Sequence, residues 1–166
     1  MKKKPSNFTQ TYHGCDFLVW RHGQEFYRAA TVLKEANDIT APYYICLSFS
    51  IELFIKCLHT TTEYKSANNV KLSVHPRSGQ HSLSDLLRQL PEDIKSDCEK
   101  KYSEKHTRSL AEDMEHIYDV FVKYRYQYED INTNKQRVLC VSIFEDVGAF
   151  FNEYSTNAGN FTQALK

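Results

Sequence analysis

The segment from Tyr43 to Thr61 constrains the fold of this chain more than any other. Its apolar residues recur at the spacing of a single wide helical face, which predicts an α-helix. A helix with so little polar surface needs neighbours on most of its sides, so we expect it to occupy the centre of a helical bundle. Its apolar face is formed by Leu47, Ile51, Phe54, Ile55 and Leu58, with Cys46 and Phe49 beside them.

Five further segments carry helical patterns, and no segment shows the alternation expected of a strand. The low glycine and proline contents, 5 and 4 residues among 166, favour long regular elements over the many turns of a β-sandwich. Together the segments predict an all-α fold, an up-and-down helical bundle of about five to six helices. The further segments cover about residues 16–37, 82–90, 107–124 and 134–154, with one more that begins at Pro91 and carries Tyr102.

The same patterns divide the chain into one domain and two tails. The helical segments lie within residues 15–154, which fits a single domain of ordinary size. Residues 1–14 and 155–166 are polar, and we expect them to be tails. Residues 63–80 are polar and contain Pro76, which predicts an exposed loop inside the domain.

The charge balance restricts where a nucleic acid can bind. Lys and Arg number 21 and balance 21 Asp and Glu, so the formal net charge is zero. The chain as a whole therefore does not attract a polyanion, and any polyanion-binding site must be a local patch. Residues 121–137 form such a patch, with four cations and two acids. Zero net charge also removes a barrier to self-association.

The cysteines indicate a reducing compartment. Their number is odd and no two are spaced as Cys-x-x-Cys, so we interpret them as reduced, mostly buried thiols and expect a cytoplasmic protein. The basic start of the chain leads into polar residues rather than the apolar stretch of a signal peptide. No apolar run approaches the roughly 18 residues of a membrane span, so we expect no membrane association. The cysteines are Cys15, Cys46, Cys57, Cys98 and Cys140.

Glu52 and Lys56 are charged residues within the most apolar predicted helix. They lie four positions apart with the acid first, which is the favourable order for a helical ion pair. One interpretation is an exposed pair on the outward edge of the helix. The other is a partly buried pair that positions or receives a ligand, because so apolar a helix has little outward surface.

His81 comes directly before a predicted helix. Ser82 can cap that helix, with Asp85 near its positive end. The start of a helix favours anions, and a histidine there can donate to a phosphate or exchange a proton. Alternatively, the His81 ring anchors the preceding loop to a neighbouring helix through a hydrogen bond.

Tyrosines alternate with Arg125 in the basic patch. Tyr126 and Tyr128 follow this arginine, a composition typical of sites that pair a phosphate with a guanidinium and stack bases on aromatic rings. In the alternative interpretation the tyrosine rings pack on the bundle, while Arg125 pairs with Glu52 or Glu129 inside it.

No other motif predicts a particular chemistry. The chain has no P-loop, no Gly-x-Gly-x-x-Gly and no Gly-x-Ser-x-Gly sequence. His13-x-Cys15 and Cys57-x-His59 do not form the two paired ligand sets of a zinc site. We therefore expect no metal and no cofactor.

Three segments resemble motifs of one helical family, and they occur in the family's order. Residues 50–58 contain Glu-Leu-Phe-Ile-Lys, residues 81–87 read His-Ser-Leu-Ser-Asp-Leu-Leu, and residues 125–129 read Arg-Tyr-Gln-Tyr-Glu. These runs are similar to the "ELxLK", "GHxLxxL" and "RYxYE" motifs of the HEPN (higher eukaryotes and prokaryotes nucleotide-binding) family. The resemblance spans about residues 15–154.

The resemblance implies an up-and-down helical bundle that often forms a homodimer. It also implies RNA binding or cleavage in toxin–antitoxin, phage-defence or stress systems, with a protein partner from the same operon as a further expectation. Ribonuclease members carry an arginine followed, after four to six residues, by a histidine. Here three residues separate Arg77 from His81, seven separate Arg108 from His116, and no histidine follows Arg125. The chain therefore departs from the ribonuclease motif.

These observations support three hypotheses. The first is a HEPN-like domain that binds RNA or a nucleotide without standard ribonuclease activity. The second is a divergent, metal-independent endoribonuclease in which His81 is the acid or base, Arg125 stabilises charge on the phosphate and Lys56 assists. The third is a non-catalytic interaction or assembly module in which the same charged residues form an internal polar network. All three require one shared recess, which we expect to contain Glu52, Lys56, His81, Arg125, Tyr126 and Tyr128.

Overall fold

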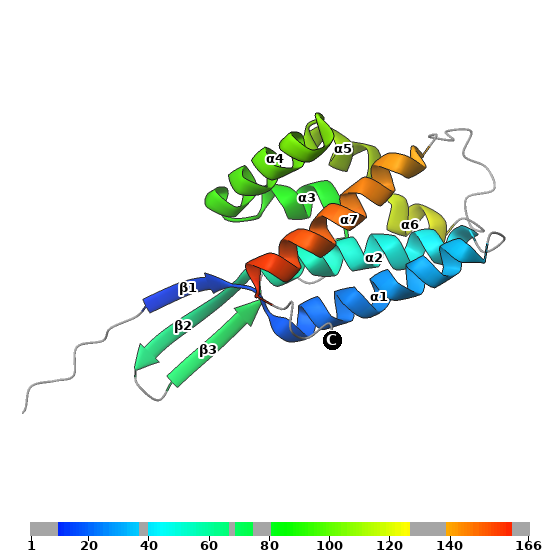
Figure 1. Ribbon diagram of the computed structural model, residues 1–166. Helices are drawn as coiled ribbons and strands as arrows, with labels where there is room; N and C mark the ends of the chain where they lie inside the picture. Colours follow the sequence, from blue (N-terminus) through cyan, green and yellow to red (C-terminus); the bar gives the residue numbers. More distant parts are fainter. Residues whose placement is uncertain (1–9, 37–39, 67–68, 75–80, 127–138, 161–166) are drawn as a thin grey trace, which may run out of the picture.

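Helix α2 (Thr40–Leu58) runs through the centre of the computed structural model, with α1, α6 and α7 packed beside it (Figure 1). More than half of its 19 residues are buried, as its apolar sequence predicts. The predicted helical bundle is therefore confirmed. The structure describes residues 10–36, 40–66, 69–74, 81–126 and 139–160.

Seven helices are present in this described part of the chain, and side-chain caps begin two of them, of which the Ser82 cap was predicted. The Asp16 carboxylate accepts a hydrogen bond from the Val19 amide at the start of α1, and the Ser82 hydroxyl accepts one from the Asp85 amide at the start of α3. Besides α2, the helices are α1 (Phe17–Glu35), α3 (Leu83–Arg88), α4 (Glu92–His106), α5 (Leu110–Ile117), α6 (Val120–Arg125) and α7 (Val141–Ala158).

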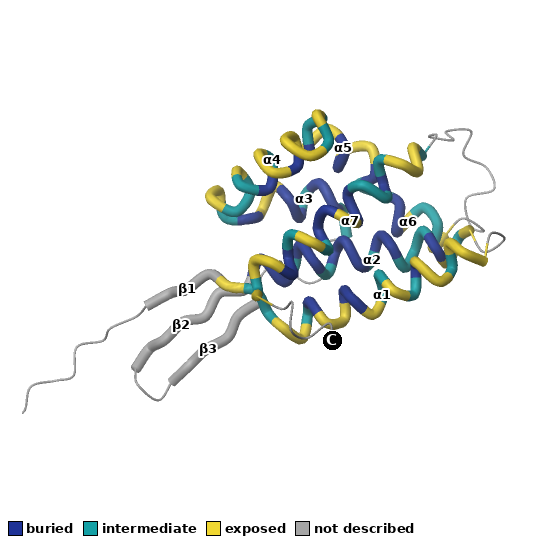
Figure 2. Tube along the Cα trace, viewed as in Figure 1, coloured by how far each residue is buried: buried dark blue, intermediate teal, exposed yellow. Residues whose placement is uncertain are grey.

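The core lies between α2 and the helices that surround it. Buried segments run along α2, α3 and parts of α7, whereas much of α4 and much of α1 face solvent (Figure 2). Two glycines allow close packing on α2. A Cβ atom at Gly23 of α1 would lie 2.8 Å from the Phe54 ring, and one at Gly148 of α7 would lie 2.7 Å from the Leu47 side chain. Both helices therefore approach α2 more closely than a larger residue allows.

A three-stranded antiparallel sheet extends from the end of the bundle where α1 begins and α2 ends (Figure 1). Its strands are β1 (Gln10–Gly14), β2 (Thr60–Ser66) and β3 (Asn69–Val74), in the order β1-β2-β3. Gly14 pairs with Thr60, so the sheet continues directly from the ends of the two longest neighbouring helices. A bulge interrupts the second pairing between Tyr64 and Ser66.

This sheet corrects two predictions. Residues 1–14 were expected in a tail and residues 63–80 in a loop, but residues 10–14, 63–66 and 69–74 lie in strands. The rest of both segments lies outside the described residues. The sequence signal for this sheet is short, because the alternation of Val70, Leu72 and Val74 with polar residues covers only the length of one strand. Such a run forms a strand here because β2 supplies the paired edge, which a local pattern does not reveal.

Two predicted helix boundaries were also wrong. The helix expected over 107–124 is two helices, α5 and α6, because the backbone leaves helical geometry at Asp119. The neighbouring Tyr118 carbonyl oxygen instead accepts a hydrogen bond from the Leu83 amide, which joins this break to the start of α3. Helix α7 continues through Ser155 and Thr156, which are buried, so the expected C-terminal tail is helical as far as Ala158.

By length and composition α2 meets the criterion for a membrane span, which the sequence analysis did not expect. In this structure, 56% of its most apolar window is buried against other elements. The central helix of a bundle meets the same criterion, so its apolar surface is accounted for by internal packing.

The five cysteines are all thiols. Cys57 and Cys98 are buried, and Cys15 and Cys46 are partly buried, as expected. Cys140 is exposed, contrary to its predicted place in an apolar helical pattern, because it precedes the first residue of α7.

Candidate functional site

Glu52 is a buried carboxylate that binds two basic side chains. Only 1% of its side chain is exposed, because it lies on α2, the helix with the largest share of the core. The Lys56 Nζ atom lies 2.5 Å from Glu52 Oε1, and the His81 Nδ1 atom lies 3.1 Å from Oε2. Burying a carboxylate without partners is costly, so these two contacts are what allow Glu52 to remain in the core. Of the two alternatives for Glu52 and Lys56, the partly buried pair is observed.

Two hydrogen bonds fix the position of α3, and they thereby place His81, which precedes α3, against α2. The Leu83 amide donates to the Tyr118 carbonyl oxygen over 3.3 Å, and His59 at the end of α2 contacts the Leu86 carbonyl oxygen at 3.1 Å. Together they fix α3 between the end of α2 and the break before α6. His81 directly precedes the capping residue of α3, so its ring position follows from these contacts.

Phe121 connects His81 to Arg125. The His81 and Phe121 rings stack, with centroids 5.4 Å apart and an interplanar angle of 29°. The Arg125 guanidinium carbon lies 5.7 Å from the centroid of the same Phe121 ring and 5.3 Å from that of Tyr126. Both distances lie within the range of cation–π attraction. We refer to Glu52, Lys56, His81, Phe121 and Arg125 as the recess cluster.

The recess cluster unites most of the predicted site residues. The structure brings Glu52, Lys56 and His81 into direct contact and places Arg125 one ring away, with Tyr126 beside it. Among the described residues Arg125 forms no ion pair, and Glu52 pairs with Lys56 instead, which contradicts the internal Arg125–Glu52 pair considered above. Tyr128 and Glu129 lie outside the described residues. Phe121 was predicted only as a residue of the apolar face, and the structure adds it to the site.

The contact with Glu52 also assigns the protons of the His81 ring. An ionised carboxylate only accepts hydrogen bonds, so the His81 Nδ1–H donates to Glu52. In the neutral ring the lone pair therefore resides on Nε2, the nitrogen that can accept a proton from a ligand. The His81 side chain is 41% exposed and Lys56 is 20% exposed, so the basic groups lie at the surface above a buried acid.

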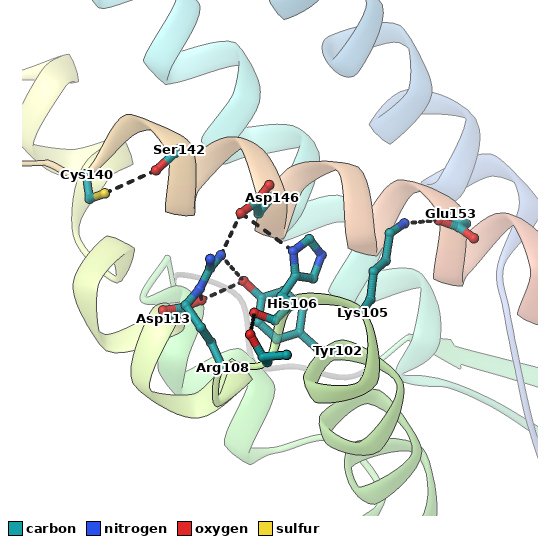
Figure 3. Close-up of polar contacts among 10 residues, drawn as sticks. Tyr102, Lys105, His106, Arg108, Asp113, Cys140, Ser142, Asp146 and Glu153 are labelled. Carbon is teal, nitrogen blue, oxygen red and sulfur yellow. Dashed lines mark hydrogen bonds and ion pairs between the residues drawn. The ribbon is translucent and has the colours of Figure 1, made fainter.

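A second polar network joins α4, α5 and α7 (Figure 3). The Arg108 guanidinium donates to Asp113 over 2.8 Å and to Asp146 over 2.6 Å, and the Tyr102 hydroxyl donates to Asp113 over 2.6 Å. His106 stacks on the Tyr102 ring and lies 3.6 Å from Asp146. Burial raises the pKa of Tyr102, and its hydrogen bond to the Asp113 carboxylate acts in the same direction.

The sequence analysis missed this network, although one signal was available. Asp113 shares the apolar stripe of its helix with Leu110, Met114 and Ile117, and an acid on such a stripe must find partners when it is buried. An open depression of about 700 Å³ lies beside Arg108, lined by acidic and basic residues of α4 and α5. Because its charges are mixed, it favours no single class of charged ligand.

The described residues contain no group of three His, Cys, Asp or Glu side chains placed to hold a metal ion. The recess cluster offers the chemistry of its own side chains. It can attract an anion through Arg125, stack a planar group on an aromatic ring, and exchange a proton at His81.

Comparisons with known proteins identify no relative of this chain. No family model matches it, and neither the curated proteins nor the solved structures include a match.

Proposed function

We propose that this chain is a HEPN-like helical domain that binds RNA or a nucleotide at the recess cluster. One observation carries the proposal: Arg125 is exposed, forms no ion pair among the described residues, and lies over two aromatic rings. A surface arginine with no carboxylate partner in the described part of the chain is available to a phosphate, and the exposed Tyr126 ring beside it can stack on a base.

The charges around Arg125 support an anionic ligand. Glu52 is neutralised by Lys56, so the acid of the recess cluster does not cancel the charge of Arg125. The resemblance to HEPN domains adds the expectation of a role in a defence or toxin–antitoxin system, with a homodimer or an operon-encoded protein as partner.

Binding is tested by fluorescence anisotropy with a labelled single-stranded oligouridine, between about 50 and 200 mM salt. We expect affinity to fall with salt, since phosphate binding releases counterions. Arg125→Ala should weaken binding by about 1–3 kcal/mol and reduce the steepness of the logarithmic salt dependence by about 0.7. Competition by AMP distinguishes recognition of one nucleotide from that of a longer strand.

The matched control is Arg21→Ala. Arg21 is also exposed, but it lies on α1 and pairs with Glu25. Its loss should leave binding unchanged. Equal binding by wild type and Arg125→Ala, or equal losses for both arginine variants, would remove the basis for the proposal.

A second candidate function is metal-independent RNA cleavage. It is favoured by the His81–Glu52 contact, because a carboxylate that holds Nδ1–H leaves Nε2 as a base for the 2′-hydroxyl proton. Arg125 would stabilise the charge that develops on the phosphate, while Lys56 pairs with Glu52. Incubating tRNA with the protein in EDTA tests this candidate, with His81→Ala and the exposed His22→Ala as matched variants. Loss of cleavage with His81→Ala alone supports it, and a wild type without cleavage excludes it.

A further inference from the structure

Two thiols lie together where the sheet meets the bundle, away from the recess cluster. Gly14 pairs with Thr60, and the Asp16 amide donates to the Cys57 carbonyl oxygen over 3.2 Å. Cys15 is thus held between two backbone contacts with the segment that contains Cys57. The Cys15 and Cys57 side chains also affect each other's pKa. These backbone contacts bring together two cysteines that are 42 positions apart in the sequence.

The two thiols differ in environment and in acidity. The Cys15 side chain is partly exposed, whereas Cys57 is fully buried and its Sγ atom also lies 3.0 Å from the Phe54 carbonyl oxygen. The contact between the two side chains lowers the pKa of Cys15 despite its burial, and the same contact, together with burial, raises the pKa of Cys57. Reactivity of a thiol follows its thiolate content and its exposure, so Cys15 has the properties of an attacking sulfur and Cys57 those of a resolving one.

The other cysteines do not offer the same combination. Burial raises the pKa of Cys46, and it raises the pKa of Cys98 to about 12. Cys140 is exposed, and hydrogen bonds from Ser142 and from the α7 backbone lower its pKa. It has no described thiol beside it to complete a disulfide. Cys140 is therefore the competing reactive thiol that an experiment must remove.

We propose that Cys15 and Cys57 form an oxidisable pair that a peroxide converts into an intramolecular disulfide. The Cys15 thiolate attacks one peroxide oxygen, the O–O bond breaks, and the hydroxide that leaves takes up a proton to become water. This step produces a sulfenic acid on Cys15. The Cys57 sulfur then loses its proton and attacks the Cys15 sulfur, and the S–O bond breaks as the second water leaves. The two sulfurs lose two electrons in total, and one hydrogen peroxide is reduced to two waters.

The disulfide would connect the start of α1 to the end of α2. Both helices pass directly into strands of the sheet at this point. Oxidation therefore fixes the junction between sheet and bundle, and it constrains the unfolded chain by closing a long loop.

The test uses the full chain with Cys140→Ser, treated with one molar equivalent of hydrogen peroxide. Remaining thiols are alkylated, and intact mass and peptide mapping locate the oxidised residues. We expect the loss of two hydrogen atoms, a Cys15–Cys57 peptide, and a higher melting temperature that dithiothreitol reverses. Before oxidation, Cys15 should react with iodoacetamide faster than Cys57 by a factor of roughly ten or more.

Two variants separate the roles. With Cys57→Ala, dimedone should trap a sulfenic acid on Cys15, because the resolving thiol is gone. With Cys15→Ser, which changes a partly exposed position, Cys57 should remain a thiol under the same treatment. A disulfide between other cysteines, or a Cys15 that reacts no faster than Cys57 in the chain that retains both, would overturn the proposal.

Discussion

The coupling between Glu52 and Lys56 gives the strongest prediction about the recess cluster. Replacing Lys56 by Met leaves the Glu52 carboxylate, which is 1% exposed, with His81 as its remaining described partner. Breaking a fully buried pair costs about 3–5 kcal/mol, and the surviving His81 contact reduces this to about 2–3 kcal/mol. Replacing Glu52 by Leu should cost less, about 1–2 kcal/mol, because the Lys56 ammonium can still reach water.

The double substitution Glu52→Leu with Lys56→Met should cost less free energy of unfolding than the sum of the two single substitutions. Both charges are then absent and apolar groups of similar volume occupy the space, a change that is often close to neutral. We expect a total cost of about 1 kcal/mol or less, which corresponds to a coupling of about 2–4 kcal/mol between the two positions. His81 remains, but its exposed side can be solvated.

Urea unfolding followed by fluorescence measures these free energies. The chain has one tryptophan, Trp20, which is buried in the core and reports on the bundle. The control is a double-mutant cycle of Arg21 and Glu25, an exposed pair with the same four-residue spacing. Its coupling should be no more than about 0.5 kcal/mol. If the two cycles give the same coupling, Glu52 is not the buried centre of the recess cluster.

Two further predictions concern parts of the bundle away from this cluster. Tyr102→Phe removes the hydroxyl that donates to the buried Asp113 carboxylate. Thermal unfolding should therefore show a loss of stability of about 1.5–3 kcal/mol. An unchanged melting temperature would mean that the second network does not stabilise the fold. Gly23→Ala gains about 1 kcal/mol of helix propensity but forces a Cβ atom against the Phe54 ring, an overpacking cost of about 1–3 kcal/mol. We expect a net loss in urea unfolding, and a clear gain would contradict the close approach of α1 to α2.

The central helix was predictable because its signal is local and strong. The apolar face around Ile51 and Phe54 has one structural solution, burial among other helices, and the structure confirms it. The break at Asp119 was not predictable in this way. It depends on a hydrogen bond between the Leu83 amide and the Tyr118 carbonyl oxygen, two groups 35 positions apart in the sequence. The sheet was missed for the same reason, since its strands are stabilised by partners distant in sequence.

The recess cluster was predicted in part. Glu52 and Lys56 drew attention as charges on an apolar helix, and His81 as a residue at a helix start, and these three are in contact. The role of Phe121 could not be inferred, because an aromatic residue on an amphipathic helix has the same pattern whether it fills the core or also stacks on a histidine. The contact between Arg125 and Phe121 was within reach of sequence reasoning, because residues four positions apart are neighbours on one helix face.

Photo-crosslinking with RNA that contains 5-iodouridine tests the central claim most directly, because this base crosslinks efficiently to aromatic rings on which it stacks. The proposed site predicts that, after digestion, the crosslinked nucleotide lies in the segment from Phe121 to Tyr126, and that Arg125→Ala greatly reduces its yield. Crosslinks confined to the charged surface of α4, or the same yield from both proteins, would contradict RNA binding at the recess cluster.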